Sequence, residues 1–516
     1  MVRYTAVIDH LQTSTTEGNR MADRPHIILI LTDQQRSDTI GAWGNKHMIT
    51  PNMDRLAREG ISFQQAYCPG ATCVASRAAI FTGMYPHTTG VYSFDPWGNH
   101  RNWVQDLADS GYFCANIGKM HFTPRDISGG FHERVIVENP TSTARDNGNA
   151  DDDWGRFLSL NGQVRPNYRQ DTDPEWMSKY QSVPWHLEEK YHSDVFIGDS
   201  AVSWIRDHHG DRPVFLEVGL TGPHEPWDPL QRHLDLYDGI TLPKRVIREG
   251  ELAEKPPQHQ AHLEAFADAG GEAKIDLRGA TDDDIDMMRR HYYAKITTVD
   301  EMVGNVLEAL EEKGWLENSL IIFCSDHGEM LGDHGLAYKW LMYDSITHIP
   351  LIVWQPGAEK NASSTDDLVS LMDLGPTILE AAGADIPTYF EGRSLLPYLD
   401  GQDIAPREFV VCEDNYQIMM RTGTHKLVYY SGQEEGELYD LAEDGDELWN
   451  RWDSTEHARI KEALLIRMLE WMVTSNYYNA GYKRNRQKQY QMRWPTEDCR
   501  KLHGRNSTSP KQIDYL

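Results

Sequence analysis

Cysteine and long apolar segments are scarce in this sequence. Six cysteines occur among 516 residues, and no two form a Cys-x-x-Cys pair, so a disulfide-stapled scaffold is excluded. A reducing, cytoplasmic setting fits this cysteine usage. Apolar runs such as 27–31 are too short to cross a bilayer, and residues 1–24 lack the layout of a secretory signal. We therefore expect a cytoplasmic protein with no membrane span.

Positive charge is also in deficit. The chain has 50 lysines and arginines against 79 aspartates and glutamates, a formal net charge of −29. A field of that sign repels nucleic acid and anionic membranes, so neither is an expected partner. An anionic substrate must find local positive charge. The 40% hydrophobic content is that of a globular protein with a sizeable core.

Apolar strands alternate with helical segments along most of the chain. Segments 25–33, 214–220 and 321–325 are apolar on both faces and end abruptly in polar residues, which predicts buried parallel strands. Helical spacing predicts helices near 194–207 and 292–310. The alternation predicts an α/β fold, a large mixed, mainly parallel sheet sandwiched by helices. Short strands at 408–412, 417–422 and 426–430, followed by a helix near 456–473, predict a smaller C-terminal α+β subdomain.

These patterns suggest a division of the chain. We expect an N-terminal extension over 1–22, with Met21 as a candidate natural start, a catalytic domain over 23–400, a C-terminal subdomain over 401–475 and a tail over 476–516. The basic, aromatic tail favours a homo-oligomer. Polar insertions near 126–192 and 228–285 are expected over the active face. Four tryptophans in or beside these insertions either form a stacking surface for a substrate or pin the loops: Trp154, Trp176, Trp185 and Trp227.

The most specific local pattern is CPGATCVASRAAIFTG over 68–83. In it Cys73 is followed two residues later by Ala75 and four later by Arg77. This spacing resembles the signature of the sulfatase family, in which such a cysteine is oxidised to formylglycine. An isolated motif of this length would equally suit a buried structural cysteine ahead of a helix.

Two polar pairs at strand ends support the resemblance. Asp33-Gln34 and Asp326-His327 occupy positions that resemble the sulfatase metal ligands. The resemblance implies one divalent metal on these four residues and the modified Cys73. Carboxylate and amide oxygens suit Ca²⁺, and the imidazole leaves Mn²⁺ open. Gln34 stands where an aspartate is commoner, His327 where an asparagine is frequent, and Ala75 where a proline is commoner.

Further motifs carry cationic and imidazole groups. GYFCANIGKMH over 111–121 resembles the second sulfatase signature, and on a strand Lys119 and His121 would point to one side. His224 in TGPHEPW and Lys339 in YKWLMYD resemble the groups that sulfatases aim at the substrate. ELYDL over 437–441 matches a C-terminal element of the family. The resemblance covers about 25–125 and 193–450.

The resemblance implies an alkaline-phosphatase-like fold and a role for each group. The nucleophile is the hydrated formylglycine on the metal. Lys119 and Lys339 attract the anion, and Arg77 fixes the nucleophile. His121 removes the second proton of the formylglycine hydrate, and His224 protonates the leaving oxygen of the ester.

The expected function is hydrolysis of aryl or alkyl sulfate monoesters. The sequence is close to bacterial arylsulfatases and to phosphonate monoester hydrolases. A phosphonate monoester or phosphodiester hydrolase with the same site, or a promiscuous enzyme, is therefore the alternative. Such enzymes commonly lack the groups of Lys119 and His121, which favours sulfate. A non-enzymatic alternative is an inactive metal-binding protein. The expected partners are a small sulfate ester and a formylglycine-generating maturation enzyme.

Overall fold

The computed structural model describes residues 24–138, 152–165, 174–269, 275–358, 360–402 and 404–483. The predicted N-terminal extension and most of the predicted tail lie outside these ranges, and the predicted domain boundaries stay predictions. Among the described residues, no helix is long and apolar enough to cross a membrane.

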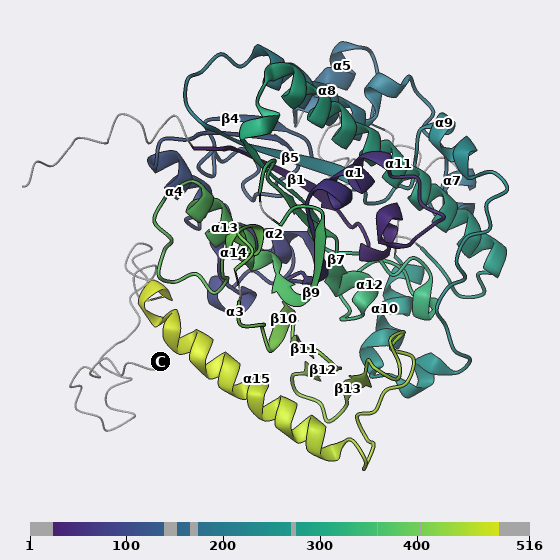
Figure 1. The fold of residues 1–516 in the computed structure, drawn as a ribbon. Coiled ribbons are helices and arrows are strands. Elements are labelled where there is room, and N and C mark those ends of the chain that lie inside the picture. The colour runs from purple at the N-terminus through teal and green to yellow at the C-terminus, as the bar shows by residue number, and fades with distance from the viewer. Residues whose placement is uncertain are drawn as a thin grey trace, which may run out of the picture. The chain divides into compact units, whose positions relative to one another are not determined.

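A nine-stranded sheet forms the centre of the fold (Figure 1). Its strands run in the order β4-β3-β5-β1-β6-β8-β2-β7, and β9 pairs with β2. The strands β1, β3, β4, β5 and β6 are mutually parallel, whereas β8 is antiparallel to β6. The bounds are β1 His26–Asp33, β2 Ile61–Tyr67, β3 Phe113–Gly118, β4 Glu133–Ile136, β5 Val214–Pro223, β6 Ser319–Ser325, β7 His348–Ile349, β8 Leu351–Trp354 and β9 Ser363–Ser370.

Both faces of this sheet are covered by helices, which explains why its strands are apolar throughout. Along β1, Ile27, Leu29 and Leu31 join one buried cluster, whereas Ile28 and Ile30 join another. The first cluster includes residues of α2 Cys73–Thr82, α4 Trp103–Asp109 and α13 Leu374–Ala381. The second includes residues of α1 Pro51–Glu59, α8 Ser193–Asp207 and α11 Asp282–Lys313. The predicted sandwich is confirmed.

Four parallel strands end at the same edge of the sheet, and this edge positions the site. Asp33 at the end of β1 lies beside Pro223 of β5, and Thr32 lies beside Ser325 of β6. On the other side of β5, Gly118 at the end of β3 approaches Gly219 so closely that a Cβ on Gly118 would lie 2.0 Å from the Gly219 carbonyl oxygen. Glycine is therefore required where the chain leaves β3.

The C-terminal sheet is an antiparallel meander. Its strands are β10 Phe409–Asp414, β11 Gln417–Thr422, β12 His425–Tyr430 and β13 Gly436–Asp440. It touches the segment ahead of Cys73, since the Glu413 amide donates to the Pro69 carbonyl at 3.0 Å. Helix α15, Ala458–Tyr478, follows it, and a second compact unit begins within that helix at Ile466.

The predicted insertions contain regular structure that the sequence pattern did not indicate. The first contributes β4 to the edge of the main sheet and helices α5 Asp153–Leu160 and α7 Pro174–Ser178, and the second contains α10 Pro257–Ala267. All four tryptophans considered above are buried. They pack inside the fold, as loop-pinning residues do, and do not form an exposed stacking surface.

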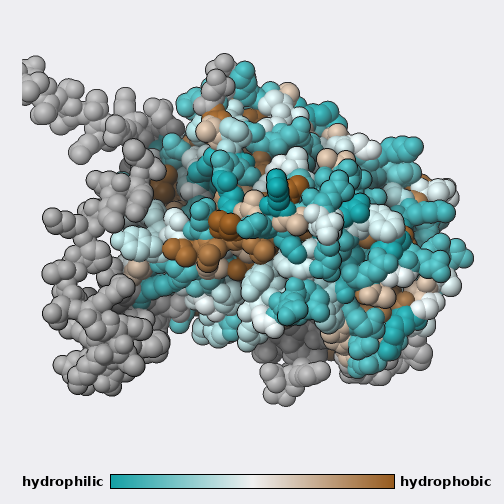
Figure 2. Space-filling model, turned by 90° about the horizontal axis from the view of Figure 1, so that it is seen from below, coloured by the Kyte–Doolittle hydropathy of each residue, from teal (hydrophilic) through white to brown (hydrophobic). Residues whose placement is uncertain are grey.

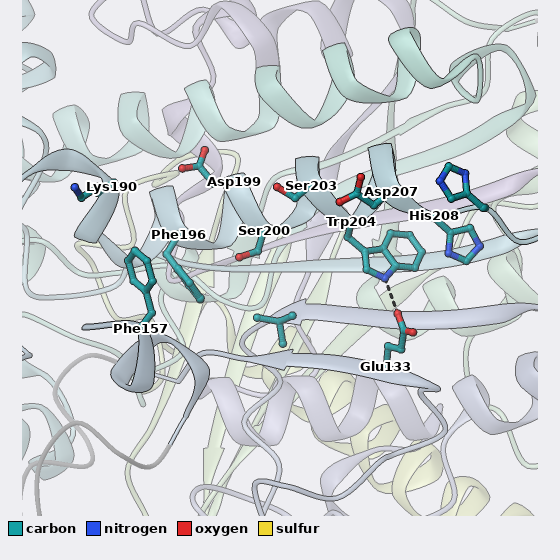
Figure 3. Close-up of a pocket in the computed structure, with 12 residues that line it drawn as sticks. Glu133, Phe157, Lys190, Phe196, Asp199, Ser200, Ser203, Trp204, Asp207 and His208 are labelled. Carbon is teal, nitrogen blue, oxygen red and sulfur yellow. Dashed lines mark hydrogen bonds between the residues drawn. The ribbon is translucent and has the colours of Figure 1, made fainter. Parts of the chain in front are cut away.

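A surface pocket and a group of exposed apolar side chains are two further features of the described residues. A pocket of about 650 Å³ is lined by residues of β4, α5 and α8 (Figure 3), and no predicted site residue lines it. Figure 2 shows a mainly hydrophilic face on which a compact group of hydrophobic residues is exposed. Exposed apolar side chains of α15 are Ile466, Leu469, Val473, Tyr477 and Tyr478.

A buried carboxyl on β5 predicts a pH-dependent stability. Burial raises the pKa of Glu217 to about 8 from an ordinary value of 4.5. The contribution of Glu217 to the free energy of unfolding is therefore fully present below pH 4.5. That contribution is lost as the pH rises toward about 8 and the folded protein must hold a buried negative charge. We expect Glu217→Gln to gain melting temperature relative to wild type between about pH 5 and about pH 9, by several degrees. A difference that stays constant over this range would contradict the assignment.

Candidate active site

Cys73 begins a helix that is buried along its whole length. The Thr72 hydroxyl caps this helix by accepting from the Ala75 amide at 3.4 Å. Gly70 lets the preceding turn pack against it, because a Cβ there would lie 2.8 Å from the Ser76 nitrogen. The side chain of Cys73 is thus fixed at the positive end of α2, where the helix dipole favours an anion.

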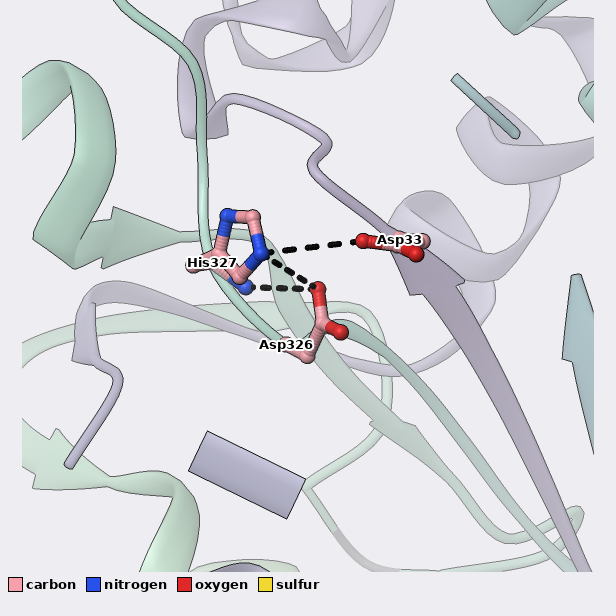
Figure 4. Close-up of side chains that lie close together, drawn as sticks. All are labelled: Asp33, Asp326 and His327. Carbon is pink, nitrogen blue, oxygen red and sulfur yellow. Dashed lines mark hydrogen bonds and ion pairs between the residues drawn. The ribbon is translucent and has the colours of Figure 1, made fainter. Parts of the chain in front are cut away.

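The side chains of Asp33, Asp326 and His327 converge (Figure 4). Their candidate ligand atoms all lie within 4.8 Å of one another. His327 Nε2 is 3.6 Å from Asp33 Oδ1 and 3.7 Å from Asp326 Oδ1. Both His327 Nε2 and Asp33 Oδ1 are buried without a hydrogen-bond partner, which is costly unless another group binds them. The residues therefore fit a divalent cation.

Arg77 connects the helix to this cluster. Its Nε donates to Asp326 Oδ2 at 2.8 Å, and its Nη1 donates to the Lys119 carbonyl at 2.6 Å. The Ser76 hydroxyl donates to the Asp326 carbonyl at 2.6 Å. The guanidinium and the Asp326 carboxylate are both fully buried, so each compensates the charge of the other.

Two buried lysines supply local positive charge in a chain whose net charge is negative. Lys119 Nζ contacts Asp33 Oδ2, and Lys339 Nζ donates to Gln34 Oε1 at 2.7 Å. Burial opposes ionisation of the Cys73 thiol, but Lys339 and Lys119 outweigh it and lower the thiol's pKa. The site therefore stabilises negative charge at the position of Cys73.

The two histidines have different environments. Burial and Lys339 hold the pKa of His224 well below its ordinary value, and its Nδ1 lies 2.8 Å from the Glu225 carbonyl oxygen. Burial and Lys119 lower the pKa of His121 to about 4. A neutral imidazole can accept a proton, as the role inferred for His121 requires.

The placement of His121 differs from the expected strand geometry. Strand β3 ends at Gly118, and His121 has φ +60°, so the alternation expected for Lys119 and His121 does not apply. The close approach of Gly118 and Gly219 turns the chain out of the sheet there. Lys119 is buried while His121 is partly exposed.

Two carboxylates that sequence reasoning missed hold the amide of Gln34. Gln34 Nε2 donates to Glu225 Oε2 at 2.8 Å and to Glu329 Oε2 at 2.5 Å. An amide nitrogen held by two acceptors leaves its oxygen facing the other way, here toward Lys339. A signal was available, because an amide in place of the commoner aspartate requires acceptors for its two N–H groups.

Four non-glycine residues around the site have left-handed backbones. They are Gln34 at φ +70°, His121 at +60°, Tyr338 at +68° and Trp340 at +76°. Such conformations cost about 1–3 kcal/mol each and persist where the surrounding structure enforces them. All four flank or carry the groups described above, and seven other non-glycine residues of the described chain also have positive φ, so the site accounts for part of this strain.

Replacing Glu329 tests whether the orientation of Gln34 matters. One Glu329 oxygen accepts from Gln34, and the other accepts from the amides of Leu331 at 3.0 Å and Tyr338 at 2.5 Å. A glutamine side chain has one acceptor oxygen where glutamate has two. Glu329→Gln must therefore lose either the hydrogen bond from Gln34 or the two hydrogen bonds from the backbone amides. We expect metal affinity, measured by competition with a chelating dye, to fall about 10–100-fold. Unchanged affinity would show that the orientation of Gln34 is set elsewhere. Glu251→Gln, a buried carboxyl bound to His334, is the control.

All ten predicted site residues lie in one cluster. Asp33 interacts electrostatically with Lys119, His224, Lys339 and Arg77. Cys73 interacts with both lysines, His327 and Asp33, and His121 with Lys119 and Arg77. Asp326 and Gln34 join through the contacts above. Their individual roles stay predictions.

Comparisons with known proteins agree with this architecture. Residues 25–384 match the sulfatase family model, and residues 332–474 match that of the C-terminal region of N-sulphoglucosamine sulphohydrolase. An arylsulfatase of Clostridium perfringens is 30% identical over 84% of this chain and 91% of its own. An N-acetylglucosamine-6-O-sulfatase of Bacteroides thetaiotaomicron is 26% identical over 87% and 86%.

Among solved structures, the phosphonate monoester hydrolase of Agrobacterium radiobacter superposes with a TM-score of 0.74 at 23% identity, covering 88% of this chain and 96% of its own. It shares the alkaline-phosphatase-like fold. The family match spans the strand-end edge, Cys73 and both strand-end pairs. The chain therefore belongs to the sulfatase family and is a hydrolase of sulfuric esters.

Proposed function

We propose that the protein hydrolyses aryl or alkyl sulfate monoesters, with Cys73 converted to formylglycine and one divalent metal held by Asp33, Gln34, Asp326 and His327. The supporting observation is a buried pair of unpartnered ligand atoms, Asp33 Oδ1 and His327 Nε2, beside a cysteine flanked by two buried lysines. Formylglycine supplies a hydroxyl nucleophile, and the cation supplies Lewis-acid polarisation. The carboxylates and the amide favour Ca²⁺, with Mn²⁺ as the alternative.

The chain's own residues account for substrate binding and proton movement. Lys119 and Lys339 attract the sulfate anion into a buried site, where their charge is screened little by water. His121 is neutral at pH 7 because burial and Lys119 lower its pKa to about 4, so it accepts a proton. His224 donates through Nε2 once the negative charge of the bound ester offsets the two lysines.

Mass analysis of the Cys73 peptide, with a metal assay on the same preparation, tests the nucleophile and the cation. We expect replacement of the cysteine sulfur by an aldehyde oxygen and about one metal per chain. A free thiol in protein from the native host favours the inactive metal-binding alternative.

Catalytic efficiencies for phenyl sulfate and a phenyl phosphonate monoester then separate the two hydrolase classes. The proposal expects a preference for sulfate. A strong preference for the phosphonate would overturn the choice of ester.

A further inference from the structure

The segment that carries His224 is buried throughout. It spans 221–228, covering the end of β5 and the turn that follows. Pro223 and Pro226 have no N–H group to donate, whereas every residue of the segment has a carbonyl group. A buried carbonyl group needs a donor. The position of the His224 imidazole therefore depends on which groups outside the segment supply these donors.

Lys295 of α11 supplies two of them. Its Nζ donates to the His224 carbonyl at 3.0 Å and to the Pro226 carbonyl at 2.7 Å. The third partner is Asp228 Oδ1, at 2.8 Å. These three acceptors match the three N–H groups of an ammonium. The side chains of Lys295 and Asp228 are only 1% and 5% exposed, so water screens their charges little.

The carbonyl between the two that Lys295 holds is bound by the imidazole. His224 Nδ1 lies 2.8 Å from the carbonyl oxygen of Glu225. A carbonyl oxygen only accepts, so Nδ1 carries a proton and proton transfer to an ester falls to Nε2. The direction of the imidazole thus follows the Glu225 carbonyl, and Lys295 holds the peptide groups on both sides of that carbonyl.

The same helix holds the segment of the metal ligands. The Tyr292 hydroxyl donates to the Gln34 carbonyl at 2.7 Å and accepts from the Arg36 amide at 3.0 Å. Tyr292 and Lys295 are three residues apart on α11, so their side chains leave the same face of the helix. One turn of a buried helix therefore contacts both the segment of Gln34 and the segment of His224.

We propose that Lys295 is a positioning residue that sets where the His224 imidazole lies relative to the metal ligands. The inference rests on the proposed function, in which His224 protonates the leaving oxygen. A lysine that served only as the counter-charge of Asp228 would have no need to bind two carbonyls of the His224 segment. Without Lys295 both carbonyls and the Asp228 carboxylate would be buried without this donor, which favours rearrangement of the segment.

Two esters that differ in their need for an acid test the proposal on metal-loaded, formylglycine-containing enzyme. Phenolate is a poorer leaving group than 4-nitrophenolate, so its departure depends more on protonation. We expect Lys295→Met to lower the catalytic efficiency about 100-fold for phenyl sulfate and only about tenfold for 4-nitrophenyl sulfate, the pattern of a lost general acid. Asp228→Asn, a milder change that keeps the side-chain shape, should give a smaller difference in the same direction.

Combination with His224→Ala separates positioning from general damage. His224→Ala should show the same difference between the two esters. Adding Lys295→Met to it should lower the efficiency by no more than about a further twofold, because residues that act through one group are not additive. Additive losses would show that Lys295 acts elsewhere and would overturn the proposal.

Lys255→Met is the matched control. Lys255 is another buried lysine, and its Nζ donates to the Glu447 carbonyl at 2.7 Å and to the Tyr439 hydroxyl at 2.9 Å. It also lies 3.3 Å from a Glu251 carboxylate oxygen. Its replacement removes a comparable set of buried bonds, so any loss of efficiency should be equal for the two esters.

Hydrogen exchange of the peptide covering 219–230 gives a readout without turnover. Lys295→Met should speed exchange in this peptide about tenfold, whereas Lys255→Met should not. Unchanged exchange in Lys295→Met, or equal losses for the two esters where His224→Ala distinguishes them, would overturn the proposal. If His224→Ala does not distinguish the esters, the acid role in the proposed function fails, and faster exchange confined to this peptide still supports Lys295 as the residue that positions the segment.

Discussion

Cys73→Ala is expected to lower the catalytic efficiency toward phenyl sulfate by about 10⁴-fold or more, the loss typical of removing a nucleophile. Cys73 lies at the start of α2 beside Lys119, Lys339 and His327, and no other group in that position can be converted to formylglycine. Alanine has one heavy atom fewer on Cβ than either cysteine or formylglycine, and the rest of the helix is unchanged. The melting temperature should therefore move by only a few degrees.

The matched control is Cys114→Ala. Cys114 is another fully buried cysteine, on β3, and burial raises the pKa of its thiol to about 12. Its replacement also removes one heavy atom from the core and should leave turnover within about twofold of wild type, since structural cysteines are inert. Turnover by Cys73→Ala within tenfold of wild type would refute the nucleophile.

Asp326→Ala should cause the largest combined loss of stability and metal. The fully buried Asp326 carboxylate accepts from Arg77 Nε at 2.8 Å. It also accepts from the backbone N–H groups of Gln34 at 3.1 Å and His327 at 2.9 Å. Its removal leaves the Arg77 guanidinium buried without that counter-charge. We expect the free energy of unfolding to fall by about 3–5 kcal/mol. Metal content, measured on protein that remains folded, should fall to background.

Two further variants make this result specific. Asp300→Asn alters a buried carboxylate that accepts from the Met53 amide at 2.7 Å, outside the cluster, and should keep its metal. Arg77→Met combined with Asp326→Ala removes both buried charges and should recover part of the lost stability. A double variant less stable than Asp326→Ala alone would show that Arg77 does not depend on this partner.

The central sheet could be predicted because its signal is local. A strand buried on both faces is apolar at every position, so β1, β5 and β6 are visible as continuous runs ending in polar residues. Strand β4 lies at the sheet edge and is partly exposed. It therefore has no such run and was missed. The buried tryptophans show the same limit, since composition does not tell which side of a polar segment faces the core.

The candidate site was predicted only as far as its motifs extend. Cys73, Arg77 and the strand-end pairs lie in recognisable patterns. Glu329 lies two residues after His327 and was still overlooked, because its role depends on meeting Gln34, almost three hundred residues earlier in the chain.

The hydrogen bonds from Gln34 to two carboxylates restrict which side chains this position can carry. Gln34→Asp would restore the commoner residue of the family, yet its carboxylate would enter a position bordered by Glu225 and Glu329. Burial already raises the pKa of Glu329 to about 7, so a further negative charge there is strongly unfavourable. Gln34→Asp alone is therefore expected to weaken the site, and a companion change of Glu225 or Glu329 to an uncharged residue is expected to relieve that cost.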